Sequence, residues 1–308
     1  MPLQEKPVGS VGEGGGRRAT PTRPRHLLCF YPADNSRALA LVLHGLNGKP
    51  ETMEEVIALL GELGVSSLLA RLSGHRGDAA EEMTLANWRA DFRQAFALAV
   101  HEAQRHGGRL YVVGHSMGCL LSTVCLAEIR GQEGLPLCLK GCVYFAPADG
   151  VRSLRGVIAA RLPAGKELFS RLVCRAMRIE EDEVVPEHVV RTLRNLGVER
   201  LPQGGRMLAG RYAAQRDLPL CAAQALRQLL YKVHEPGFVY SPTRTLVFLD
   251  PADPLIDAAN LTQLIQSRRL DWQLQVLPKG KRPHMCIWPS HVGWNIVRAR
   301  VKRFADSD

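Results

Sequence analysis

From residue 26 to residue 146, short, mainly apolar runs alternate with longer segments whose apolar residues recur at helical spacing. Runs of this kind are typical of strands that are buried on both faces of a sheet. The runs, each predicted to be a strand, are His26–Tyr31, Leu39–Leu43, Val65–Ala70, Leu110–Val113 and Cys142–Ala146. This alternation predicts an α/β fold with a mostly parallel central sheet flanked by helices.

The segments between these runs carry ordinary helix signals. Pro50 opens a helix that Gly64 ends, with apolar positions at 53, 56, 57, 60 and 63. A second helix is predicted to begin at the N-cap Thr84 and to place Trp88, Phe92, Phe96 and Val100 on one face. A third follows the run at 110–113 and closes at Gly131.

The alternation stops between residues 147 and 242. Helical patterns are predicted at 168–179, 187–196 and 219–231, and no segment there reads convincingly as a strand. An insertion at the strand tips of an open sheet covers the crevice where ligands bind. We therefore predict a helical cap at 147–242, inserted into a core made of 26–146 and 243–308.

The alternation resumes with a strand at 244–249, a helix at 257–267, a strand at 272–277 and a last helix at 292–304. Residues 1–25 are rich in Gly, Pro, Arg and Thr and lack apolar periodicity, so they are predicted to form a disordered tail.

Composition narrows the class of protein. Hydrophobic residues make up 46% and charged residues 23% of 308, as in globular proteins with a sizeable core. No apolar run approaches the length of a membrane span, and no signal peptide is expected, because the N-terminal residues lack an apolar core. The eight cysteines show no Cys-x-x-Cys spacing. Buried, reduced thiols are therefore expected rather than disulfides or a zinc site, and the predicted compartment is cytoplasmic. No metal ion or cofactor is expected.

The net charge of +10 raises the question of an anionic partner. The basic residues are scattered, and no nucleic-acid-binding motif accompanies them, so no nucleic-acid partner is expected. Arg171, Arg175 and Arg178 share one face of the predicted helix 168–179. We favour solvated arginines there, with transient contact between the cap and lipid aggregates as the alternative. The oligomeric state is not indicated.

The segment Gly114-His115-Ser116-Met117-Gly118 joins a predicted strand to a predicted helix. A serine at the apex of such a tight turn needs small residues two before and two after it, and its hydroxyl then projects above the sheet. The N–H of Met117 lies at the helix start, where donors lack an intrahelical partner. Ser116 is therefore predicted to be a nucleophile, beside one half of an anion site.

The loop His44-Gly45-Leu46-Asn47-Gly48 follows the central run 39–43. The N–H of Leu46 is predicted to face the same point as that of Met117, and two such donors form an oxyanion hole. The alternative is a plain turn, because Asn-Gly is a strong turn signal.

A serine nucleophile requires a base, and the base requires an orienting acid. Asp253 lies in the loop after the strand 244–249 and is the favoured acid, with Asp250 as the reserve. Asp257 is expected to cap the next helix, and Asp149 is a remote fourth candidate.

Placement after the last strand favours His284 as the base, with His291 as the reserve, although His291 is also placed to cap the last helix. His44 and His115 flank the predicted site and are expected to be structural hydrogen-bonding groups.

These motifs resemble those of α/β-hydrolases of the monoacylglycerol lipase and bacterial carboxylesterase kind. The resemblance covers about residues 26 to 304 and rests on 44–48, 50–53, 74–77, 114–118, 253–256 and His284. It implies Ser116 as nucleophile, Asp253 as acid, His284 as base, and the Leu46 and Met117 amides as the oxyanion hole. A glycine is usual in the family three residues before the acid, where this chain has Asp250, so the acid remains open.

The leading functional hypothesis is hydrolysis of a small-molecule or lipid-like carboxylic ester through an acyl-serine intermediate. An acyltransferase or a thioesterase would use the same groups. A binding protein that has the fold but lacks catalysis is the remaining alternative.

Overall fold

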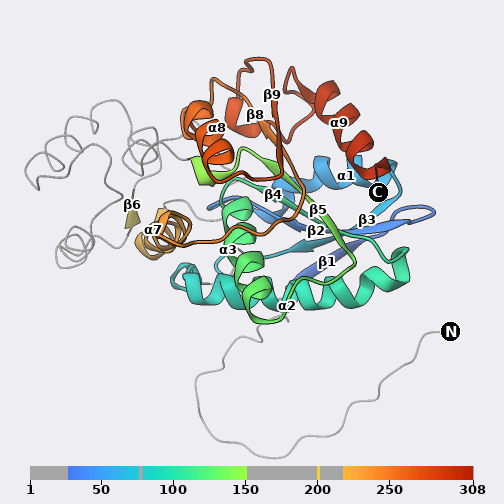
Figure 1. The fold of residues 1–308 in the computed structure, drawn as a ribbon, viewed down its shortest axis with the longest axis horizontal. Helices are drawn as coiled ribbons and strands as arrows, with labels where there is room; N and C mark the ends of the chain where they lie inside the picture. Colours follow the sequence, from blue (N-terminus) through green and yellow to red (C-terminus); the bar gives the residue numbers. More distant parts are fainter. Residues whose placement is uncertain (1–26, 76–78, 151–199, 202–217, 308) are drawn as a thin grey trace, which may run out of the picture.

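A seven-stranded sheet forms the centre of the protein, in the order β1-β3-β2-β4-β5-β8-β9 (Figure 1). The computed structural model describes residues 27–75, 79–150, 200–201 and 218–307. The strands are β1 (Leu28–Tyr31), β2 (Ala38–Leu43), β3 (Val65–Ala70), β4 (Leu110–His115), β5 (Leu139–Phe145), β8 (Thr245–Leu249) and β9 (Trp272–Val276). Every residue of β2, β3, β4 and β8 is buried, as their apolar runs predict.

All neighbouring strands of this sheet are parallel except β1, which runs antiparallel to β3 with Leu28 opposite Ala70. The mostly parallel sheet is therefore confirmed. The antiparallel direction of β1 was not predicted, because an apolar run indicates burial but not the direction in which a strand runs.

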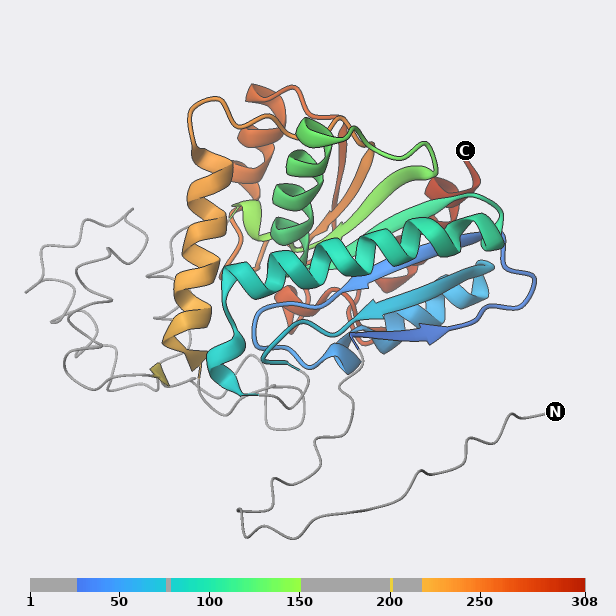
Figure 2. The same ribbon diagram turned by 90° about the horizontal axis from the view of Figure 1, so that it is seen from below.

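Helices cover both faces of the sheet. The views in Figures 1 and 2 agree that α1 and α9 lie on one face and that α2 and α3 lie on the other. The longer helices are α1 (Glu54–Glu62), α2 (Leu85–Ala103), α3 (Met117–Gln132), α7 (Leu220–His234), α8 (Ala258–Ser267) and α9 (Trp294–Asp306). No helix in the described ranges has the length and hydropathy needed to cross a membrane.

The predicted helix starts are confirmed at two caps. The Thr84 side chain accepts a hydrogen bond from Asn87 N at the start of α2. Asp257 Oδ1 accepts from Ala259 N at 2.8 Å at the start of α8. Asp257 therefore caps α8, as expected.

Short 3₁₀ turns shape the connections. They are η1 (Pro50–Met53), η2 (Ala80–Glu82), η3 (Gln104–His106), η4 (Ala148–Gly150) and η6 (Pro283–Met285). Two of them, η4 and η6, follow β5 and β9 and lie at the carboxyl end of the parallel strands, where ligands bind in open α/β sheets.

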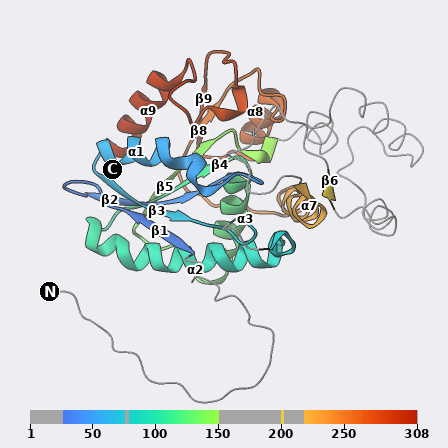
Figure 3. The same ribbon diagram turned by 180° about the vertical axis from the view of Figure 1, so that it is seen from behind.

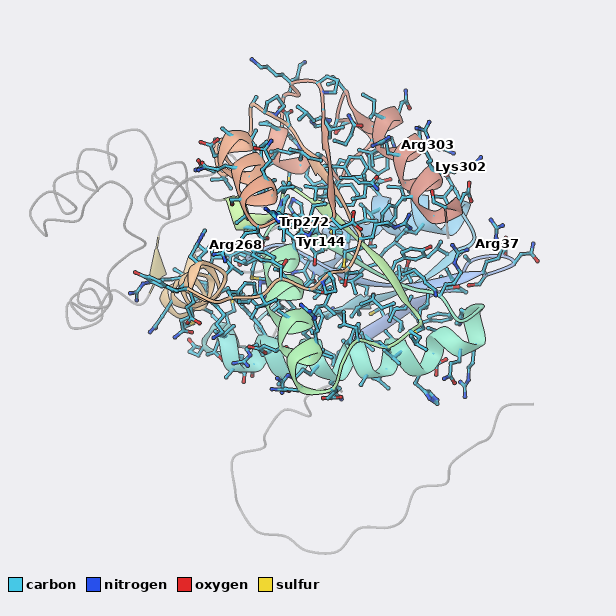
Figure 4. The ribbon with its side chains drawn as sticks, in the orientation of Figure 1. Arg37, Tyr144, Arg268, Trp272, Lys302 and Arg303 are labelled. Carbon is cyan, nitrogen blue, oxygen red and sulfur yellow. The ribbon has the colours of Figure 1, made fainter. Side chains whose placement is uncertain are left out.

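The core extends from the sheet to both helical layers. Trp88 and Phe92 of α2 are fully buried against one face. Tyr144 of β5 meets Trp272 of β9 edge to face, with ring centroids 5.7 Å apart (Figure 4). All seven cysteines of the described residues are free, and four of them are buried, as expected for reduced thiols.

Only parts of the predicted cap lie within the described residues. The third predicted helix is present as α7, which packs against α3 and α2 (Figure 3 shows it from behind). Contrary to expectation, β6 (Arg200–Leu201) and β7 (Leu218–Pro219) form a short antiparallel pair. Two-residue strands are too short to show an apolar pattern. The predicted tail, the helices at 168–179 and 187–196, and the arginine face lie outside the described residues.

Candidate active site

Ser116 lies at the sharp turn between β4 and α3. Its backbone has φ +52° and ψ −117°, a conformation that L-residues rarely adopt. Two hydrogen bonds fix it: Ser116 N donates to Phe145 O at 2.9 Å, and Ser116 O accepts from Ala148 N at 3.2 Å. Its neighbours in β4 and α3 are buried, whereas Ser116 is partly exposed. Strained residues held this firmly cluster at functional sites.

The two flanking glycines have no room for a side chain. A Cβ on Gly114 would lie 2.8 Å from Cys119 N, and a Cβ on Gly118 would lie 2.6 Å from His44 O. These contacts confirm the expected reason for glycine at both positions: α3 starts directly against β4 and against the end of β2.

The loop after β2 touches the serine. A Cβ on Gly45 would lie 3.3 Å from Ser116 Cβ. Gly48 N donates to Gly45 O at 3.1 Å, so the loop also contains the turn that the Asn-Gly pair predicts. Within the described part of the chain, the Leu46 and Met117 N–H groups donate no hydrogen bond to protein. Both amides therefore remain available to a ligand.

Two buried histidines hold this loop. His44 Nδ1–H donates to Gly45 O at 3.0 Å, and His44 Nε2 accepts from Leu72 N at 3.3 Å. Burial lowers the pKa of His44 to about 4, so the ring is neutral and can accept at Nε2. His75 Nε2 accepts from Asn47 N at 3.1 Å. The role of His44 matches the prediction. His75 lies in the segment 74–77 that carries part of the resemblance, but no role was predicted for it.

The favoured acid and base are paired. His284 Nδ1 lies 2.8 Å from Asp253 Oδ2, and both side chains are buried. Asp253 Oδ1 also accepts from Leu255 N at 2.9 Å and from Ile256 N at 3.3 Å. Burial by itself would raise the pKa of Asp253. The His284 charge and hydrogen bond, together with the two amides, outweigh burial and hold that pKa below its usual value. Asp253 is therefore a carboxylate that accepts a hydrogen bond from the His284 ring.

The reserve acid and the reserve base are paired with each other. His291 Nε2 lies 3.0 Å from Asp250 Oδ2, which also accepts from Gly280 N at 2.6 Å. His291 Nδ1 accepts from Gly293 N at 3.0 Å, next to the first turn of α9. This second pair joins the loop after β8 to the loop after β9. Sequence reasoning weighed both residues only as substitutes and missed their pairing.

His115 links the sharp turn at Ser116, called the elbow from here on, to the segment after β9 that carries His284. His115 Nε2–H donates to His284 O at 2.9 Å, and the two ring centroids are 5.0 Å apart. Ser116 Oγ and the His284 ring share no hydrogen bond in the described structure. Such contacts are often long before substrate binds. The residue next to Ser116 nevertheless contacts the backbone of His284.

Asp149, the remote fourth candidate for the acid, forms no hydrogen bond with a histidine of the described residues. Its carboxyl group is buried at 3% exposure in η4, and neither oxygen has a hydrogen-bond partner among the described residues. Burial raises its pKa to about 7. Within the same described ranges, no group of three His, Cys, Asp or Glu side chains is placed to hold a metal ion.

The chain thus has a strand, a strained serine and a helix in succession, followed nearer its C-terminal end by an aspartate–histidine pair. A family profile also matches most of the chain. The profile described as "Alpha/beta hydrolase family" matches residues 40–291. The chain belongs to this family. None of the curated protein sequences compared with this α/β-hydrolase matches it.

Solved structures share the fold of this α/β-hydrolase at low sequence identity. A monoglyceride lipase from Saccharomyces cerevisiae is 13% identical, with a TM-score of 0.61, over 91% of this chain and 90% of that one. A monoacylglycerol lipase from Paleococcus ferrophilus is 14% identical, with a TM-score of 0.58, over 91% and 98%. A structure from work on the metagenome-derived lipolytic enzymes LipS and LipT is 18% identical, with a TM-score of 0.59, over 92% and 99%.

Proposed function

We propose that this α/β-hydrolase cleaves carboxylic esters through an acyl-serine intermediate, with Ser116 as nucleophile, His284 as base and Asp253 as acid. The observation that carries the proposal is the buried 2.8 Å contact between Asp253 and His284 beside a serine at a strained elbow. A carboxylate that accepts from Nδ1–H leaves the other ring nitrogen, Nε2, free to take a proton.

In the first half of the reaction, His284 Nε2 takes the Ser116 hydroxyl proton while Oγ bonds to the ester carbonyl carbon. The carbonyl oxygen becomes an oxyanion. The C–O bond to the alcohol then breaks, and the departing oxygen receives the proton from His284. In the second half, water loses a proton to His284, attacks the acyl carbon and releases the acid, and Ser116 regains its proton.

The Leu46 and Met117 amides are the proposed oxyanion donors. Both N–H groups lack a protein acceptor in the described structure, and the Gly45 backbone next to Leu46 contacts Ser116. A preorganised donor of this kind contributes about 2.7–4 kcal/mol to stabilisation of the transition state. His44 and His75 hold the loop that would present the Leu46 amide.

We further propose that the substrate is a small-molecule or lipid-like ester with a medium or long acyl chain, and that 147–242 forms a cap over it. The structures with this fold include lipases that act on monoglycerides, which supports a lipid-like ester here. The packing of α7 against α3, the helix that begins at Met117, supports a place for the insertion beside the site.

The test uses p-nitrophenyl esters of graded acyl length with wild-type protein and Ser116→Ala. We expect turnover that depends on chain length in the wild type and none above background in Ser116→Ala. A fluorophosphonate probe is expected to label Ser116, located by mass spectrometry. A folded wild-type protein with no turnover at any length and no labelled serine would reject the proposal. A competing alcohol or thiol distinguishes hydrolysis from acyl transfer by its products.

A further inference from the structure

The ring of His115 lies between the elbow and the segment that carries the proposed base. It is buried, with 5% of its surface exposed. Its Nε2 lies 2.9 Å from the backbone oxygen of His284. Because a carbonyl oxygen only accepts, Nε2 carries the hydrogen, and the neutral ring is the Nε2–H tautomer. This hydrogen bond joins the residue before Ser116 to the backbone of His284.

The opposite side of the same ring faces the loop after β2. His115 Nδ1 lies 2.9 Å from the point that a Cβ on Gly45 would occupy. The ring therefore packs against the Gly45 backbone, and only a residue without a side chain fits there. One imidazole thus contacts both the loop proposed to hold the oxyanion and the turn η6, which holds His284.

The electrostatic surroundings keep the His115 ring neutral. Burial, and then the proximity of His284, lower the pKa of His115 to about 3. His44, in the loop after β2, lowers it further. Asp253, after β8, and the hydrogen bond to His284 O act in the opposite direction without cancelling the effect. The Nε2–H donor is consequently present throughout the neutral range.

The Asp253–His284 contact fixes the orientation of the His284 ring but leaves the backbone of η6 to be placed by other contacts. We propose that His115 is a positioning residue, which sets the spacing between Ser116 Oγ and the His284 ring by holding the backbone of His284. This inference rests on the proposed ester hydrolysis, since it assigns a role within that same site. A misplacement of about 1 Å between reacting groups costs on the order of 100-fold in rate.

Two substitutions separate the hydrogen bond from the volume of the ring. His115→Phe keeps a ring but removes the donor, and His115→Gln restores an N–H on a similar length of side chain. We expect His115→Phe to lower kcat about 30- to 100-fold, with KM changed by less than about threefold. His115→Gln is expected to recover at least about tenfold of that loss. His101→Phe, at an exposed position of α2, is the matched control and should retain wild-type kcat.

Two kinetic results would overturn the inference. One is a kcat for His115→Phe within twofold of wild type. The other is a kcat for His115→Gln no better than that of His115→Phe, which would assign the role to ring packing. An inactive wild type that no fluorophosphonate labels would remove the proposed function and the positioning role together. An active wild type with an unimpaired His115→Phe variant removes the positioning role alone.

The protonation state of His115 in the wild-type protein provides a second readout, which does not depend on turnover. In ¹⁵N-histidine NMR spectra, assigned by the signal lost in His115→Gln, we expect His115 to remain the neutral Nε2–H tautomer from pH 5 to pH 9. Titration of this ring with a midpoint near 6.5, or an Nδ1–H tautomer, would contradict the hydrogen bond on which the inference rests.

Discussion

Asp250 and His291 form a buried pair, with Oδ2 and Nε2 3.0 Å apart, in the same two loops that carry Asp253 and His284. Gly280 completes it: its N–H donates to Asp250, and a Cβ on Gly280 would lie 2.7 Å from His291 Nε2. Two aspartate–histidine pairs therefore link the loops after β8 and β9. We propose a catalytic role for the pair Asp253–His284 and a structural role for the pair Asp250–His291.

These two roles predict different effects when the two aspartates are replaced: a loss of turnover at Asp253 and a loss of stability at Asp250. Asp253→Asn keeps the shape of the side chain but disfavours the tautomer that His284 needs. We expect it to lower kcat by about two to four orders of magnitude with little loss of stability. Asp250→Ala leaves the His291 and Gly280 donors buried, and each unsatisfied donor costs about 1–3 kcal/mol of unfolding free energy.

Ester turnover and urea unfolding of the two variants make the comparison. A larger loss of kcat in folded Asp250→Ala than in Asp253→Asn would exchange the two assignments and make Asp250 the acid.

Two glycines of α3 test the tight start of that helix. A Cβ on Gly118 would lie 2.6 Å from His44 O, whereas a Cβ on Gly131 meets no atom within 4 Å. Gly118→Ala is expected to cost about 1–3 kcal/mol by overpacking and to displace the loop that carries Leu46. Gly131→Ala is expected to add about 0.5–1 kcal/mol by reducing backbone entropy in the unfolded chain.

The measurements are urea unfolding and ester turnover, with Gly131→Ala as the matched control for the exchange of residue type. Equal stability of the two variants would mean that α3 does not start as closely against His44 as the structure indicates.

The buried carboxyl group of Asp149 predicts a dependence of stability on pH. Its pKa is raised by burial from 3.8 to about 7, so the folded protein holds a proton that the unfolded chain releases first. The resulting stability is fully present below pH 4, falls as the pH rises, and is lost above pH 7. The shift corresponds to a contribution on the order of 4 kcal/mol. Asp149→Asn, which stays neutral, is expected to remove this part of the slope.

Unfolding free energies from urea titrations at pH 5 and pH 8 measure this effect. Asp271→Asn, at an exposed position, is the control and should retain the wild-type slope. The prediction fails if Asp149→Asn and wild-type protein lose the same stability between these two pH values.

Most of the core was predictable because its signals are local. The apolar runs gave the strands of the sheet to within a few residues, and the helix starts at Thr84 and Asp257 follow from their cap chemistry. Ser116 was marked by Gly114 and Gly118, since only residues without side chains allow the strand and the helix to meet so closely. The β6–β7 pair and the direction of β1 were not predictable, because pairing depends on partners distant in the sequence.

The sequence by itself determined the strands of the central sheet and the helices that pack on it, and placed a serine at a sharp turn, because these features depend on neighbouring residues. Only the tertiary structure decided that Asp253 meets His284 while Asp250, three positions earlier, meets His291. Both aspartates lie in one loop, and both histidines follow the same strand. The direction in which each side chain points is set by the loop backbone and by contacts such as the hydrogen bond from Gly280 N–H to Asp250. No local sequence pattern encodes these contacts.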